Sequence, residues 1–245
     1  MSLFPKFRAL FPVLFGLCAS LSLTPSASAA LCGTIASPTA CSITLANNVT
    51  FDASAFSLVH SFGAGGGDVY QGADIRIDIF AFDTDTVELR FSLNPDGPST
   101  RNSFNVNREE ISAFIFEYSL LATAAAPGSA QIIDPIEVNI SSATAGNGLV
   151  TAQLIVPSGP ASCQAFNGAQ TDICFGLPGS ITNALTAGDI VNLSGNSGNA
   201  ALQHVNNRFT AVFTPSQNDV PIPATASLLM LGLLGLRRAR RCAAS

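Results

Sequence analysis

Hydrophobic and polar side chains alternate along two neighbouring stretches in the first half of the chain. From Ala73 to Phe82 three isoleucines alternate with charged residues, and Val87 to Leu93 alternates apolar with polar positions. A period of two is typical of an antiparallel strand with one buried face. The Asp83-Thr84-Asp85 segment between them predicts a hairpin turn, and Asp78 should then face Arg90 as a surface ion pair. The same register pairs Ile75 with Leu93, Ile77 with Phe91 and Ile79 with Leu89.

Further apolar runs, separated by Gly, Pro, Asn and Ser, predict more strands. The middle of the chain shows no sustained helical periodicity and no fixed-length repeat. Pro215 cannot donate to a ladder and should end the last strand. The additional strands are expected at Ser42–Leu45, Ala55–Phe62, Ile111–Leu120, Ile132–Ile140, Leu149–Val156, Ile190–Leu193 and Phe209–Thr214. We predict an all-β fold, a single β-sandwich of roughly nine to eleven strands, with jelly-roll and immunoglobulin-like topologies both open.

The N-terminal segment has the order of a secretory signal peptide. Lys6 and Arg8 precede an uncharged run from Ala9 to Leu23, and small residues fill positions 26–30. This order predicts a signal helix over residues 1–30, removed by signal peptidase after Ala29 or Ala30. A buried or membrane helix is the alternative.

The C-terminal segment combines a short proline motif, an uncharged stretch and a basic cluster. Residues 220–236 would span about 25 Å as a helix, slightly less than a hydrocarbon core of roughly 30 Å. The basic cluster should remain cytoplasmic, which places the preceding chain on the other side of the membrane. The motif is Val220, Pro221, Ile222, Pro223 and Ala224, and the cluster is Arg237, Arg238, Arg240 and Arg241. A transmembrane helix is therefore predicted within residues 220–241, and a buried core helix is the alternative.

This tail resembles the PEP-CTERM sorting signal of Gram-negative bacteria. Ile222 stands where the commonest form of the motif has Glu, which is more similar to the VPLPA-type variant. The resemblance covers the last 26 residues. It implies recognition by an exosortase-type membrane protease, cutting near the proline motif, and delivery to the cell surface or exterior, often beside exopolysaccharide. The final Cys242-Ala243-Ala244-Ser245 also matches a prenylation box, a eukaryotic modification that an exported bacterial protein would not receive.

These ends divide the chain into five segments. We expect a signal peptide at 1–30, a β-sandwich ectodomain at 31–214, a spacer at 215–219, the sorting segment at 220–241 and a tail at 242–245. The region from 31 to 219 contains all sixteen acidic side chains against five arginines. Such a negative field repels phosphate backbones and argues against nucleic acid as a partner. Lys6 is the only lysine, so the ectodomain has none for a Schiff base or a P-loop.

Four cysteines remain once the two ends are set aside. Cys32, Cys41, Cys163 and Cys174 would enter an oxidising compartment on export. Three pairings are open, and the spacing favours Cys32 with Cys41 and Cys163 with Cys174. Zinc would require closer cysteine pairs than these.

Candidate binding residues are few. Asp68, Asp83 and Asp85 lie in expected turns, and carboxylates on irregular backbone are calcium ligands, although solvated turn acids are the simpler interpretation. No other cofactor is indicated. A glycan site would need an exposed aromatic, and Tyr70 is the candidate, since Tyr118 continues a core alternation.

Candidate catalytic residues are equally scarce. His60 and His204 are the only histidines, and both are interpreted as structural. Glu109 and Glu110 would point to opposite faces if extended, unlike the facing pair of a glycosidase. We therefore expect an exported, non-enzymatic surface or matrix protein with no catalytic residues. The alternatives are a secreted hydrolase of extracellular polysaccharide and a calcium- or glycan-binding module.

Overall fold

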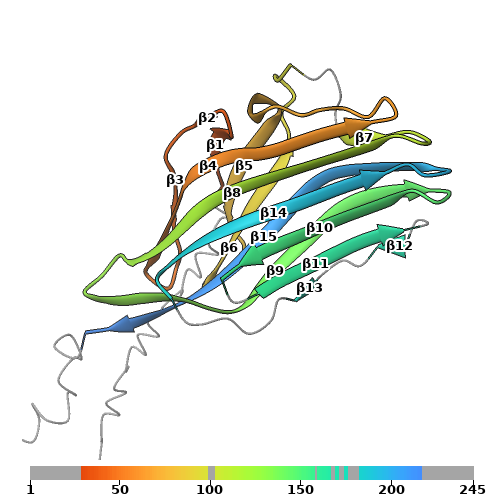
Figure 1. Ribbon diagram of the computed structural model, residues 1–245. Helices are drawn as coiled ribbons and strands as arrows, with labels where there is room; N and C mark the ends of the chain where they lie inside the picture. Colours follow the sequence, from red (N-terminus) through yellow and green to blue (C-terminus); the bar gives the residue numbers. More distant parts are fainter. Residues whose placement is uncertain are drawn as a thin grey trace, which may run out of the picture.

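The computed structural model describes residues 29–98, 103–157, 159–166, 169–170, 174–175 and 182–216. Within these residues the chain is all-β, with strands β1 to β15 and one short 3-10 helix, η1, at Gly72–Asp74. The strands form two antiparallel sheets that pack face to face, as in a β-sandwich (Figure 1). The coarse prediction of the fold is therefore confirmed.

Sheet A contains eight strands. Its order is β13-β9-β15-β6-β5-β1-β2, and β7 pairs with β15 beside this path. Its strands are β13 (Cys174–Phe175), β9 (Gly128–Ala145), β15 (Asn199–Pro215), β6 (Thr86–Leu93), β5 (Ile75–Ala81), β1 (Ala29–Thr34), β2 (Ser37–Pro38) and β7 (Phe104–Val106).

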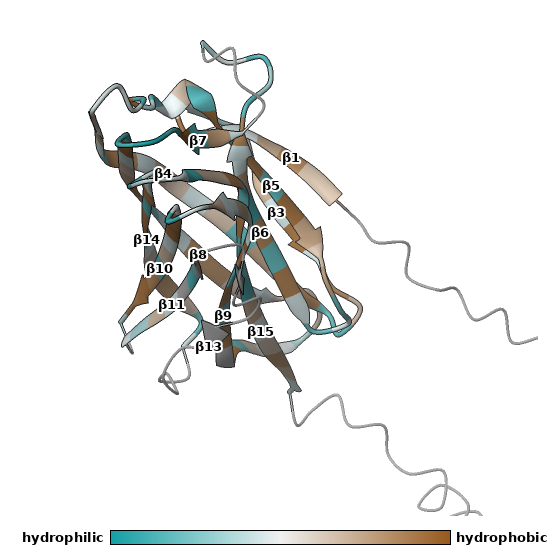
Figure 2. Ribbon diagram, turned by 90° about the vertical axis from the view of Figure 1, so that its right-hand side faces the viewer, coloured by the Kyte–Doolittle hydropathy of each residue, from teal (hydrophilic) through white to brown (hydrophobic). Residues whose placement is uncertain are grey.

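Sheet B contains seven strands in the order β12-β11-β10-β14-β8-β4-β3. These are β12 (Ala169–Gln170), β11 (Gly159–Phe166), β10 (Leu149–Val156), β14 (Ala184–Ser194), β8 (Ile111–Ala124), β4 (Val49–Ala64) and β3 (Cys41–Thr44). In both sheets a late strand separates earlier ones: β14 lies between β10 and β8, and β15 lies between β9 and β6. Figure 2 shows the two layers from the side, with β14 and β10 in one and β5 and β6 in the other.

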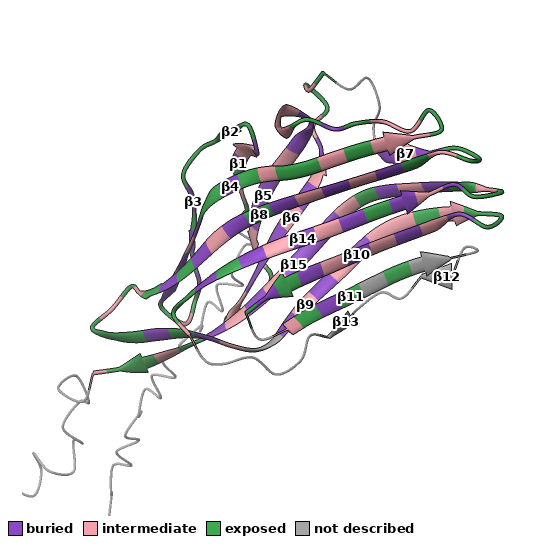
Figure 3. Cartoon of the chain, in the orientation of Figure 1, coloured by how far each residue is buried: buried purple, intermediate pink, exposed green. Residues whose placement is uncertain are grey.

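The core lies between the two sheets and is rich in aromatic side chains. Along β8 every second residue is buried, and the same alternation runs through the neighbouring strands of sheet B (Figure 3). The ring of Phe116 lies 4.3 Å, centroid to centroid, from Phe91 of sheet A. Tyr118 is buried and lies edge-on to Phe209, so its predicted place in the core is confirmed. Contacts of this kind join the two inner faces and dominate the burial of apolar area.

The predicted β5–β6 hairpin has the expected register. Ile75 pairs with Leu93, Ile77 with Phe91 and Ile79 with Leu89. All the expected strands are present, β10 with the bounds predicted, but several are longer: β14 begins at Ala184 and β15 at Asn199. The last strand ends at Pro215, as its missing N–H predicts.

A disulfide joins Cys32 of β1 to Cys41 of β3. This pairing was favoured by the sequence spacing and is confirmed. Because β1 belongs to sheet A and β3 to sheet B, the bond links the two sheets at one edge. The side chains of Cys163 and Cys174 lie outside the described residues, so their pairing stays a prediction.

Both predicted export segments fall largely or wholly outside the described residues. These residues include Ala29 and Ala30 as the start of β1, and they end at Ser216, before the proline motif. Over the part of the chain that the structure describes, no helix has the length and apolar character needed to cross a membrane.

Candidate functional site

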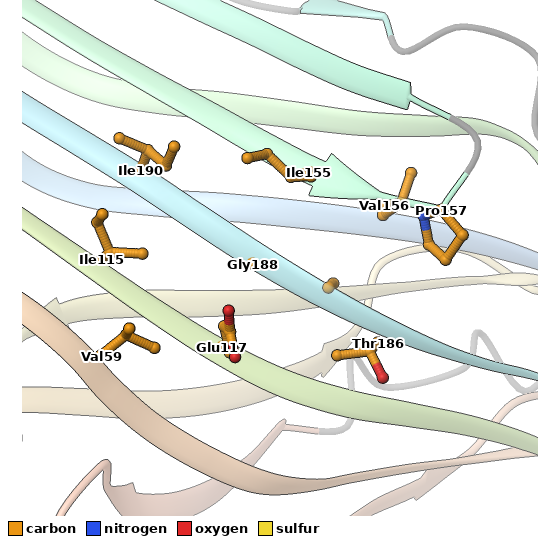
Figure 4. A pocket seen from close by; sticks show the side chains of 10 residues that line it. Val59, Ile115, Glu117, Ile155, Val156, Pro157, Thr186, Gly188 and Ile190 are labelled. Atoms are coloured by element: carbon orange, nitrogen blue, oxygen red, sulfur yellow. The ribbon is translucent and has the colours of Figure 1, made fainter.

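The outer face of sheet B carries a groove of about 460 Å³. Its walls come from four neighbouring strands, β4, β8, β14 and β10, and are mostly aliphatic (Figure 4). Its lining includes Val59, Ile115, Ile155 and Ile190, and the carboxylate of Glu117 is the one charged group in the lining. The groove therefore offers an apolar surface with a single hydrogen-bonding acid.

Two local features of the strands produce this hollow. Gly188 of β14 lies opposite Glu117 of β8 and has no side chain to fill the floor. A Cβ atom at Gly188 would lie 3.3 Å from Cγ of Glu117, so the glutamate side chain already lies over this position. On β4 a register shift between Leu58 and His60 leaves Val59 as an extra residue, 55% exposed. A bulge of this kind redirects a side chain that would otherwise continue the alternation.

The outer face of sheet A is charged, and its charges are paired with one another. Glu88 is 3% exposed and accepts hydrogen bonds from Arg90 and from Arg208, each at 2.9 Å. Asp78 accepts two hydrogen bonds from Arg76, at 2.8 and 2.9 Å. Such charge-assisted bonds are the stronger ones in proteins.

The expected ion pair between Asp78 and Arg90 is therefore wrong, although the two residues do face each other in the ladder. Arg76 reaches Asp78 along its own strand, and Arg90 turns instead to Glu88 and to the side-chain oxygen of Asn206. Glu88 is the more buried carboxylate and already lies within reach of a second arginine. It competes successfully for Arg90, which also lies over the ring of Phe80 at 4.6 Å.

A buried polar cluster lies between the sheets. The side-chain amide of Asn207 donates to the carboxyl of Asp189 at 2.6 Å and to the hydroxyl of Tyr118 at 2.8 Å. Burial raises the pKa of Asp189 to about 8, although the bond from Asn207 opposes the shift. Burial, together with the nearby Asp189 charge, also raises the pKa of Tyr118. Asp189 is 0% exposed, so this proton-holding group has no open path to a substrate and acts on stability.

The three candidate calcium ligands do not come together. The backbone carbonyl of Thr84, between Asp83 and Asp85, bonds to Asn47 just before β4 begins. Asp68 follows the other end of β4, a strand of 16 residues, which separates the two sites by on the order of 50 Å. Within the described residues no group of three or more His, Cys, Asp and Glu side chains is arranged to hold a metal ion. Asp68, Asp83 and Asp85 therefore do not form one shared calcium site in this structure.

Tyr70 is also not the exposed aromatic that a glycan site requires. It is 2% exposed, with its ring 4.9 Å from Phe104 and 5.5 Å from Phe114. The glycine loop before it folds back over the top of the core: the hydroxyl of Ser112 donates to the carbonyl of Asp68. The tyrosine is therefore drawn inward by aromatic packing that the local sequence did not reveal.

The two histidines lie on opposite outer faces. His60 is exposed on β4, opposite Ile115 and beside the groove. His204 lies on β15, where partial burial lowers its pKa, nearby Arg90 lowers it further and Glu88 opposes both. Glu109 and Glu110 lie in a turn, where Glu110 accepts from the backbone N–H of Asn107. The sequence predicted no groove at any of these residues.

The groove residues themselves were missed because no local pattern marks them. Glu117 and Gly188 are 71 positions apart and meet only because β14 inserts beside β8. Asp189 was missed for the same reason. One signal was present: Asp189 interrupts the apolar side of an alternating run from Leu185 to Leu193.

No protein-family model matches this chain, and neither does any curated protein. Among solved structures, the enzymatically active domain of tailspike protein 4 from bacteriophage CBA120 is similar with a TM-score of 0.22 and 13% identity over 68% of this chain. This chain spans 19% of the length of that tailspike chain. A similarity at this level carries no argument about fold or activity.

Proposed function

We propose that this chain is an exported, non-enzymatic protein of the cell surface or extracellular matrix. In this proposal signal peptidase removes residues 1–30, and the C-terminal segment anchors the chain in the membrane. An exosortase-type protease then cuts near Val220 and releases the β body or attaches it at the surface. The observation that carries the proposal is the order of features at the C-terminus: proline motif, uncharged stretch and arginine cluster. A helix with cytoplasmic arginines leaves the body outside.

The place where the last strand ends supports a cut at the proline motif. Strand β15 ends at Pro215, and the motif starts five positions later at Val220. The pairing of β15 with β9 continues to that end. Cutting at the motif would therefore remove no described strand, and the body would keep its core.

The disulfide gives independent support for export. Bonds of this kind form and persist in oxidising compartments and are rare in the bacterial cytosol. Cys32 and Cys41 are both buried in the core, where the bond links the two sheets. The chain therefore contains a covalent link suited to the exterior.

The alternative functions find less support in the described residues. A glycosidase uses two carboxylates across a cleft, and the groove offers Glu117 alone. Tyr70 is buried, and the candidate calcium ligands lie at opposite ends of β4. The proposal for the surface protein therefore rests on its delivery signals and not on a catalytic or ligand site.

Intact-mass spectrometry of the protein from its native host tests the proposal. We expect a species that begins at Ala30 or Leu31, ends near Val220 and is about four daltons lighter than its reduced form, one hydrogen for each bonded sulfur. Pro221→Ala combined with Pro223→Ala should abolish C-terminal processing, whereas Pro215→Ala, outside the motif, should leave it unchanged. A wild-type species that remains in the membrane and still ends at Ser245 would overturn the sorting mechanism.

A further inference from the structure

We propose that the outer face of sheet B is a self-association surface to which a second copy of this chain docks. The surface comprises the outward positions of β4, β8, β14 and β10 between the row of Ile111 and the row of Ser119. We call it the sheet B face. This inference goes beyond the proposed function and does not depend on how the chain is sorted.

Charge is distributed unequally between the two outer faces. Sheet A presents Arg76, Asp78, Glu88, Arg90 and Arg208 on its outer side. On the sheet B face Glu117 is the one acidic or basic side chain apart from His60. Depletion of charge is the compositional mark of the centre of a protein interface.

Large apolar side chains are exposed on the same face. Val59 is 55% exposed, Phe62 47%, Ile155 42% and Ile111 41%. Val59 and Ile155 line the groove together with Ile115 and Ile190, and Phe62 and Ile111 lie farther along the β4–β8 ladder. Several large exposed apolar side chains on one face of an otherwise acidic body mark an interaction surface.

The size of the sheet B face suits a dimer. Four strands about 4.8 Å apart, each contributing about 30 Å of length, give a projected area of about 600 Å². A standard interface buries about 800 Å² of accessible surface on each partner, and side-chain relief makes accessible area larger than projected area. One such face is therefore close to what a stable homodimer needs.

The two polar groups at the groove complement each other across a two-fold axis. His60 lies opposite Ile115, and Glu117 lies two positions farther along β8 on the same side of the sheet. In an isologous pair each patch meets its own copy. An axis in the plane of the interface, midway between these two residues, sets His60 of each copy against Glu117 of the other. Both carboxylates then gain a partner, and the surrounding aliphatic side chains are buried.

Other occupants fit this surface less well. A polysaccharide would be expected to stack on exposed Trp or Tyr, but the chain has no Trp and both tyrosines are buried. A basic partner would be drawn to the acidic residues elsewhere on the body and not to a face with one carboxylate. A second copy is the occupant that supplies both the apolar area and the matching histidine.

The test measures self-association of the full chain in mild detergent by sedimentation velocity over a range of protein concentrations. Wild type should reach a mass of two chains, and Ile190→Arg should weaken the dimer at least tenfold. Ser141→Arg, which adds the same charge to the outer face of sheet A, should leave the dimer unchanged. His60→Glu should weaken it because two carboxylates then face each other across the axis, and Glu117→Lys should weaken it because the acceptor for the histidine N–H is lost. The double variant should restore it.

The double variant also controls for misfolding and for association through the C-terminal segment. A tail-driven dimer would be insensitive to all three substitutions on the sheet B face, and that result would overturn the proposal. So would a wild type that stays monomeric at the highest concentration, or a double variant no stronger than the two single ones. Failure of C-terminal processing, by contrast, would change only the mass of each subunit, so the two proposals fail separately.

Discussion

At the scale of single residues, Asp189 makes stability depend on pH. Its pKa is about 8 in the folded state against 3.8 in its ordinary state. Between these values the folded protein holds a proton that the unfolded chain has released. The contribution of Asp189 to stability is therefore fully present below about pH 4 and falls by up to about 1.4 kcal/mol per pH unit as the pH rises toward 8.

We expect Asp189→Asn to remove this slope, because an amide does not titrate and can still accept from Asn207. Urea unfolding at pH 5 and pH 8 should show wild type losing stability between the two values and the variant losing much less. Glu109→Gln, at an exposed carboxylate, should keep the wild-type slope. Equal slopes in wild type and Asp189→Asn would show that Asp189 is ionised in the folded protein.

Glu88 is the second residue with a measurable energetic role. Its side chain is 4% exposed and lies between Arg90 and Arg208, whose side chains are 35% and 15% exposed. Removing one partner of a buried ion pair costs about 3 kcal/mol or more, and the partial exposure of the arginines reduces this to about 2 kcal/mol for Glu88→Gln. Glu109→Gln, whose pair with Arg108 is exposed, should cost about 0.5 kcal/mol or less. Urea titrations that give equal losses would contradict this difference.

At the scale of elements, the sequence predicts the pairing of consecutive strands but not the pairing of strands that are distant in the sequence. The β5–β6 hairpin was predicted with its register because its strands are consecutive and each buries one face. The neighbours of β14 and β15 were not predictable, since β14 pairs with β8, some 70 positions earlier. Nothing in the alternation of one strand identifies a distant partner. The groove depends on that pairing and was therefore invisible in the sequence.

Gly195, in a turn, and Gly188, in a strand, differ in how much room they leave for a side chain. At Gly195 a Cβ atom would overlap the backbone carbonyl of Asn107, in the turn that precedes β8, whereas at Gly188 the nearest atom is the flexible side chain of Glu117 at 3.3 Å. We expect Gly195→Ala to cost about 2 kcal/mol through backbone displacement. Gly188→Ala should change stability by less than about 1 kcal/mol. Thermal unfolding of the two variants measures both losses of stability, and a larger loss for Gly188→Ala would contradict the prediction.

At the scale of the whole molecule, four cysteines belong to strands at or near the two edges of the layered body. Cys32 and Cys41 join β1 of sheet A to β3 of sheet B. At the other edge Cys163 belongs to β11 of sheet B and Cys174 to β13 of sheet A, and these two strands contact each other. A second disulfide there would close the body covalently on both sides. Sequence spacing favoured this pair, and the strand order gives it a structural role that spacing could not show.

We therefore expect non-reducing peptide mapping to recover Cys163 linked to Cys174 as well as Cys32 linked to Cys41. Each bond closes a loop of about ten residues, which corresponds to about 2.5 kcal/mol of stability. Because the edges lie on opposite sides of the sheets, losses from Cys32→Ser with Cys41→Ser and from Cys163→Ser with Cys174→Ser should add within about 0.5 kcal/mol. Free thiols at Cys163 and Cys174 in protein taken from the oxidising compartment would refute the second bond. A combined loss well above the sum would show that either edge alone suffices to hold the two sheets together.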